Sequence, residues 1–173
     1  VYHEKEFLGQ FTIPLYGNHM VLNSLACIIV CIYLGVNTQD IQRLFSNFKN
    51  AARRFSLKTF GDIVTIDDYA HHPTEIKVTL EAARAKYPDK KLIAVFKPNT
   101  YSRTAAFTKE FADSLKIADK VFMTEIDCNR EKQEDYPGIT SSLVLKDIPD
   151  GEIIGEDDVD KLLKYQNAVI CFM

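Results

Sequence analysis

Beyond residue 53, short apolar runs alternate with longer amphipathic segments along the chain. The apolar runs predict strands over 63–66, 92–96, 121–126 and 168–173, and the segments between them predict helices over 73–87 and 105–116. Strands that alternate with helices form right-handed crossovers, which build a mostly parallel sheet with flanking helices. The sequence therefore predicts an α/β fold for residues 54–173.

The first 53 residues follow a different pattern. Alternation predicts a strand over 6–15, and a nearly all-apolar segment predicts a helix over 19–34 that is buried between layers. Thr38 is expected to cap a second, amphipathic helix. One strand and two helices cannot close a core alone, so residues 1–53 are expected to be the tail of a larger domain. Because the chain also stops on an apolar strand, we expect both ends to be trimmed from a longer protein.

Composition narrows the classes of partner. A net charge of −3 gives no electrostatic reason to expect a nucleic acid. The longest apolar stretch, 25–34, is too short to cross a bilayer, so no membrane insertion is expected. The four cysteines form no CxxC pair and no stapling pattern. Reduced thiols of this kind predict a cytoplasmic protein.

Polar side chains gather where three of the predicted strands end, over 67–72, 97–103 and 127–130. Open parallel sheets bind their ligands at the carboxyl ends of the strands. If two of these strands are neighbours, side chains of two loops face each other across one crevice. These side chains are Asp68, Tyr69 and His71 on one loop, and Lys97, Asn99 and Arg103 on the other. Carboxylate, imidazole and guanidinium groups around one pocket suit a polar anionic ligand.

The stretch DDYAHH (67–72) can also be interpreted as a metal cluster, which would favour a metal-dependent phosphohydrolase. Adjacent histidines chelate one ion poorly, however, and no other Asp/His motif supplies further ligands, so we expect no metal. No GxSxG elbow, GxxxxGK[ST] loop or GxGxxG motif is present, and no catalytic residue is predicted in this chain. A non-catalytic interaction domain is a further alternative.

Part of this loop has a structural interpretation. Pro73 suits the first position of a helix, with His72 as its N-cap and Glu75 reaching back to the backbone. Neighbouring side chains usually point apart, so one residue of the pair Asp67 and Asp68 is expected to contact a ligand.

Two further sets of residues allow a structural and a functional interpretation. His19 and Asn23 lie one helical turn apart on one face. The structural interpretation is that the histidine caps the helix and the asparagine lies in the core. Arg54 follows Arg53 where the pattern changes, either as part of a surface basic pair or as a hinge residue that reaches phosphates.

Four segments together resemble a known family. GNHMVLNSLA (17–26), ARRF (52–55), DDYAHHPTEI (67–76) and FKPNTYSRT (96–104) occur in the order and spacing of the Mur ligases, the ATP-dependent amide-forming enzymes of peptidoglycan synthesis. The resemblance implies a Rossmann-like C-terminal domain over 54–173. It also implies that residues 1–53 are the end of the central ATP-binding domain.

The resemblance also implies roles for individual residues. His19 and Asn23 match positions beside the adenine, Arg54 matches an arginine that reaches the ATP phosphates, and Asp68 matches the carboxylate that binds the ribose. Tyr69 and His71 match positions that line the amino-acid site, where Asn99 also lies. Arg103 matches the arginine that pairs with the carboxylate of the incoming amino acid. Lys97, Asn99 and Thr100 depart from the usual motif, which places the amino-acid contacts in question and not the fold.

Within the family, the motifs resemble most closely the branch that joins L-alanine to UDP-N-acetylmuramate through an acyl phosphate. ATP and Mg²⁺ are the implied cofactors, bound mainly by parts of the protein outside this chain, and the chain alone is expected to be inactive. The alternative within the family is the recycling ligase, which joins a tripeptide to the same sugar nucleotide.

Overall fold

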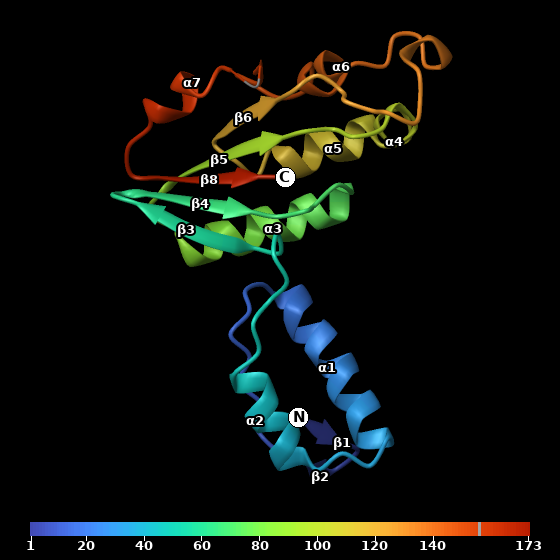
Figure 1. The fold of residues 1–173 in the computed structure, drawn as a ribbon, viewed down its shortest axis with the longest axis vertical. Coiled ribbons are helices and arrows are strands. Elements are labelled where there is room, and N and C mark those ends of the chain that lie inside the picture. Colours follow the sequence, from blue (N-terminus) through green and yellow to red (C-terminus); the bar gives the residue numbers. More distant parts are fainter. Residues whose placement is uncertain (156) are drawn as a thin grey trace. The chain divides into compact units, whose positions relative to one another are not determined.

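The computed structural model describes residues 1–155 and 157–173. The chain divides into two compact units, Val1–Ala52 and Arg53–Met173, which Figure 1 shows in blue to cyan and in green to red. This division falls one residue before the boundary expected from the sequence.

The first unit is mainly helical. Its elements are β1 (Tyr2–His3), β2 (Glu6–Phe7), α1 (Asn18–Tyr33) and α2 (Thr38–Ser46). The strand predicted over 6–15 is wrong except for its first two residues, which pair with β1. A strand requires a partner along its length, and β1 offers only two residues. The cap of α2 is Asn37 and not Thr38, because the Asn37 side chain accepts a hydrogen bond from the Gln39 amide at 2.8 Å.

Within this unit the first helix is largely exposed, so its predicted burial between the layers of a larger domain stays a prediction. Ser24 and Ile28 are the residues of α1 that are buried. Large apolar side chains of the same helix stay exposed, namely Val21, Leu22, Leu25, Ile29, Val30 and Tyr33. The reason is that the first unit offers α1 little more than α2 to pack against, and α2 covers one stripe of it.

The second unit contains the predicted α/β sheet. Its strands are β3 (Ser56–Phe60), β4 (Ile63–Asp67), β5 (Lys91–Phe96), β6 (Lys120–Met123), β7 (Glu152–Ile153) and β8 (Ala168–Phe172). They lie in the order β3-β4-β8-β5-β6-β7, with β3 antiparallel to β4 and all other neighbours parallel. The fold class is therefore confirmed. In Figure 1, β8 lies between β4 and β5.

Helices cover the sheet on both faces. They are α3 (Pro73–Lys86), α4 (Tyr101–Ala106), α5 (Thr108–Leu115), α6 (Ser141–Leu145) and α7 (Asp160–Leu163), with a 3-10 turn, η1, at Gln133–Asp135. Alternate strand residues point to opposite faces. Leu92 and Ala94 pack with side chains of α3, α5 and α6, whereas Ile93 packs with Leu162 of α7.

Several elements differ from the sequence prediction. The helix predicted over 105–116 begins earlier, at Tyr101, and is interrupted at Phe107, where φ is −128°. The strand β3 was not predicted, because Ser56–Phe60 is a partly exposed edge strand with no continuous apolar run. Within the described residues, every helix is too short or too polar to cross a membrane.

Candidate functional site

The two loops expected to face each other leave the sheet on either side of β8. One follows β4 and the other follows β5, and β8 pairs with both strands. The two strands are therefore not direct neighbours, since β8 separates them. Their loops nevertheless meet, because Arg103 Nη1 donates a hydrogen bond to the His71 carbonyl at 3.4 Å. The carboxyl edge of the sheet thus brings the two sequence motifs into contact.

Arg103 is held at this contact by two hydrogen bonds. Its Nη1 also donates to Asn99 Oδ1 at 2.9 Å, one helical turn earlier in the chain. A small pocket is lined by His71, Asn99 and Arg103 together with Phe96, Pro98, Thr100, Thr104 and Phe111. A guanidinium has several N–H donors in a rigid fork. With one nitrogen committed to the protein, the remaining donors suit a carboxylate at the rim of this pocket.

The His71 ring is oriented by its own loop. Its Nδ1 lies 2.8 Å from the Tyr69 carbonyl oxygen and 3.4 Å from Glu75 Oε2. A carbonyl can only accept, so Nδ1 carries the proton in this contact, and Nε2 is the ring nitrogen that can reach a ligand.

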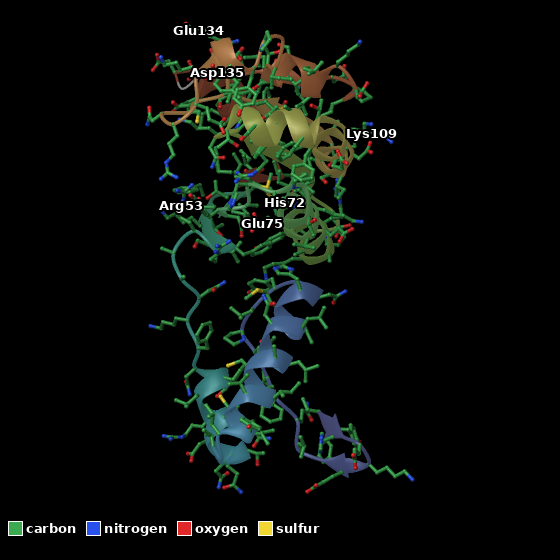
Figure 2. The ribbon with its side chains drawn as sticks, turned by 90° about the vertical axis from the view of Figure 1, so that its right-hand side faces the viewer. Arg53, His72, Glu75, Lys109, Glu134 and Asp135 are labelled. Atoms are coloured by element: carbon green, nitrogen blue, oxygen red, sulfur yellow. The ribbon has the colours of Figure 1, made fainter. Side chains whose placement is uncertain are left out.

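Glu75 supports this loop from the first turn of α3. Its Oε2 accepts from the amides of His71 at 2.9 Å and His72 at 3.2 Å. Burial alone would raise the pKa of Glu75, but these amides and the His71 charge lower that pKa below its ordinary value. His72 Nδ1 in turn accepts from the Thr74 amide at 3.3 Å, so the predicted capping box is confirmed. Figure 2 labels His72 and Glu75 at this helix start.

The two aspartates before Tyr69 point in different directions. Asp67 is half exposed and its Oδ1 lies 3.3 Å from Arg53 Nε. Asp68 is 8 % exposed, and its Oδ2 accepts from the Phe55 amide at 2.8 Å. Burial raises the pKa of the Asp68 carboxyl, and the Phe55 and Ala70 amides with the Arg54 charge offset part of that rise. Asp68 thus binds the backbone just before β3. Its role in binding a ribose stays a prediction.

Tyr69 lies beneath two guanidinium groups. Arg53 Cζ is 5.1 Å and Arg54 Cζ is 5.8 Å from the centre of its ring. The Tyr69 amide also donates to the Arg53 carbonyl at 2.8 Å. The structure therefore places Arg54, from the segment before β3, over Tyr69 in the loop after β4, with positive charge over an aromatic face.

Lys97 does not join the pocket at Arg103. Its Nζ lies 2.9 Å from Asp127 Oδ2, and both residues line a second pocket of about 300 Å³. The remaining walls of that pocket come from Thr124, Glu125, Ile126, Ile153, Ile154 and Gly155. The expectation that Lys97 faces the Asp68 loop is therefore wrong, because its long side chain turns toward the end of β6.

His19 and Asn23 belong to the first unit. His19 Nδ1 is buried without a hydrogen-bond partner among the described residues. Asn23 is exposed, and its Nδ2 lies 3.9 Å from Met20 Sδ. Asn23 is therefore not a core asparagine within this unit. The predicted place of His19 and Asn23 beside an adenine stays a prediction.

The described residues offer no set of side chains that could bind a metal ion. In residues 1–155 and 157–173, no three side chains of His, Cys, Asp or Glu are grouped so that they could hold a metal ion. Asp67 and Asp68 are engaged with Arg53 and with the Phe55 amide instead. The geometry therefore gives the phosphohydrolase alternative no support.

Comparison with known proteins decides the family. Residues 53–170 match the family described as "Mur ligase, glutamate ligase domain", which is more than half of the chain. The chain belongs to the Mur ligase family. The resemblance found in the sequence motifs is thereby confirmed.

Individual Mur ligases are similar over the whole chain. The UDP-N-acetylmuramate–L-alanine ligase of Levilactobacillus brevis is 49% identical over 175 residues, which cover 100% of this chain and 39% of that protein. The enzyme of the same name from Lactiplantibacillus plantarum is 51% identical over 174 residues, covering 99% and 39%. The chain thus spans about two fifths of the length of these curated relatives.

Solved structures of Mur ligases share the fold. The UDP-N-acetylmuramate-alanine ligase of Thermotoga maritima superposes with a TM-score of 0.72 at 26% identity, covering 94% of this chain and 35% of that one. A murein peptide ligase from Psychrobacter arcticus gives a TM-score of 0.66 at 25% identity, with the same two coverages.

Sequence reasoning missed one residue at this Mur ligase site. Glu131 accepts a hydrogen bond from the Ser102 amide at 3.0 Å and another from the Ser102 hydroxyl. These residues are 29 positions apart. No local pattern links them, and the acidic loop that contains Glu131 reads as a solvated segment.

Proposed function

We propose that this chain is the C-terminal part of an ATP-dependent ligase that joins L-alanine to UDP-N-acetylmuramate in peptidoglycan precursor synthesis. The relatives that are 46–51% identical over the chain are enzymes of this name. On this proposal, residues 1–53 are the end of the central ATP-binding domain, and the enzyme acts in the cytoplasm in cell-wall biogenesis.

One observation of the site supports the proposal most directly. The Arg103 guanidinium is held by Asn99 Oδ1 and by the His71 carbonyl at the carboxyl edge of the sheet. A cation fixed in this way can pair with the carboxylate of a free amino acid and leave its amine unbound. His71 and the exposed ring of Tyr69 would line the same amino-acid site. The pocket is too narrow to admit a water molecule, so the amino acid would bind at its rim.

The chemistry requires no nucleophile from the protein. ATP would supply the phosphoryl group that converts the muramyl carboxylate into an acyl phosphate. The alanine amine then attacks the acyl carbon, the C–N bond forms, and inorganic phosphate leaves. Binding the alanine carboxylate to Arg103 directs the amine toward that carbon, so the chain contributes positioning and positive charge.

The family resemblance assigns four residues of this chain to the nucleotide. Arg54 would reach the phosphates and Asp68 the ribose, and His19 with Asn23 would lie beside the adenine. The role of Arg54 is supported by its place over the Tyr69 ring, with its Cζ 5.8 Å from the ring centre, and by its charge beside Asp68. Mg²⁺ is implied by the family, but the described residues contain no group of acidic side chains that would hold it. Its ligands would come from the rest of the ligase.

A tripeptide-adding ligase is the alternative, because a murein peptide ligase has a similar fold. The test is to supply the complete ligase with UDP-N-acetylmuramate, ATP and either L-alanine or a tripeptide, and to measure released phosphate and product mass. We expect L-alanine to give the higher kcat/KM, because a short zwitterion reaches Arg103 while its amine faces the acyl phosphate. A higher kcat/KM for the tripeptide would reject the alanine assignment.

A further inference from the structure

The helix that carries Arg103 lacks a cap of its own. The N-cap residue of α4, Thr100, makes no side-chain hydrogen bond to the first turn, and its buried Oγ1 has no partner among the described residues. A helix of six residues has few internal hydrogen bonds and frays easily when its first amides are unpaired. The Arg103 side chain is held by Asn99 and His71, but its backbone, at the third position of α4, depends on another source of order at the helix start.

Glu131 supplies the missing cap from a distant loop. Its two oxygens accept from the amide and from the hydroxyl of Ser102, and a hydrogen bond from the Tyr101 backbone adds to them. These hydrogen bonds, the Ser102 hydroxyl first, lower the pKa of Glu131 below its ordinary value, so the carboxylate is charged at neutral pH. A negative charge at a helix start is also favourable for the helix dipole.

A second contact joins the same loop to the same helix. The rings of Tyr101 and Tyr136 are stacked, with centroids 6.1 Å apart and an angle of 12° between their planes. Glu131 and Tyr136 both belong to the segment between β6 and α6. Two independent contacts thus attach this segment to the start of α4.

We propose that Glu131 is a positioning residue of the ligase, which caps α4 from the loop after β6 and thereby holds Arg103 in place for the incoming carboxylate. The claim rests on the proposed function, because it assigns Glu131 to recognition of the amino acid. Glu131 itself does not touch the pocket lined by Arg103, Asn99 and His71.

The capping half of the proposal can be tested without any substrate. Amide hydrogen exchange of the 173-residue chain is compared for wild type, Glu131→Ala, Glu131→Gln and Glu134→Ala. Glu134 is an exposed carboxylate in the same loop, so its removal is the matched control for lost charge (Figure 2). We expect the amides of 101–103 to exchange about fivefold faster or more in Glu131→Ala, the factor for one net hydrogen bond. Glu131→Gln retains an acceptor and a donor for Ser102 and should restore most of the protection.

The positioning half requires the complete ligase. Glu131→Ala should raise the KM for L-alanine about threefold to tenfold, as expected for a less ordered Arg–carboxylate contact. The KM for ATP should stay near the wild-type value, as should both constants in Glu134→Ala. If circular dichroism shows that Glu131→Ala is unfolded, Ser102→Ala replaces it and should shift the alanine KM in the same direction.

The outcomes separate the two claims. The positioning role is overturned if folded Glu131→Ala shows unchanged amide exchange at 101–103 or an unchanged KM for L-alanine. The proposed ligase function still stands in that case, provided that wild type turns over L-alanine. If wild type takes no L-alanine, the proposed function fails and the positioning claim fails with it.

Discussion

Replacing Arg103 by alanine is the most direct perturbation of the site. The side chain has one nitrogen bound to Asn99 Oδ1 and to the His71 carbonyl, and its other donors can face a ligand. A hydrogen bond to a charged group contributes about 1.5–3 kcal/mol. If one such contact to the alanine carboxylate is lost, kcat/KM for L-alanine should fall about 10- to 150-fold.

The assay is steady-state phosphate release by the complete ligase, with L-alanine and ATP varied separately. The loss should appear in the KM for L-alanine, while the KM for ATP changes little, because the proposed role of Arg103 is to bind the amino acid. Lys109→Ala is the matched control, since it removes one exposed positive charge from the neighbouring helix α5 (Figure 2). Arg103→Lys keeps the charge without the planar fork and should recover only part of the activity. A folded Arg103→Ala enzyme with a wild-type alanine KM would refute the reasoning.

Two substitutions test the loop before α3. Asp68→Asn keeps an acceptor for the Phe55 amide but removes a charge that burial disfavours. Because the pKa of Asp68 is raised in the folded protein, wild-type stability falls as pH rises through that pKa. The difference in melting temperature between the variant and wild type should therefore increase in favour of the variant as pH rises above the ordinary 3.8. A difference in melting temperature that is the same at every pH would contradict this. Glu75→Ala removes the acceptor of two amides and should cost about 0.5–1 kcal/mol in urea denaturation at pH 7. Since the pKa of Glu75 is lowered, that cost should vanish as pH falls below the ordinary 4.5, and Glu81→Ala, which loses only an exposed pair to Lys77, should show neither effect.

The sequence predicted those parts of the fold that depend on local pattern. The strands β4, β5 and β8 were expected nearly at their observed bounds, because each contains a short, mostly apolar run that is buried or half-buried in the sheet. The edge strand β3 was missed since three of its five residues are exposed to solvent. The break at Phe107 was also missed, because apolar spacing continues across it.

The site was predictable to the same extent. His71, Asn99 and Arg103 stand in short motifs at strand ends, and the structure brings them together. The partner of Asp68 is a backbone amide, which carries no residue signature. Glu131 is fixed by a contact across 29 residues, and no spacing rule connects an acidic loop to a helix start at that distance.

The position of β8 has a consequence for folding. This strand is the last of the described strands in sequence order, yet it lies in the middle of the sheet, and the Asn167 amide beside it bonds Asp62 Oδ2 at 2.6 Å across 105 residues. Contacts of such long range form late, because a large loop must close before they gain any energy. The loop that carries His71 and the helix α4 that carries Arg103 follow the strands on either side of β8. Until β8 enters, these strands have no common neighbour, so we expect the proposed amino-acid site to form in the same late folding step that completes the sheet.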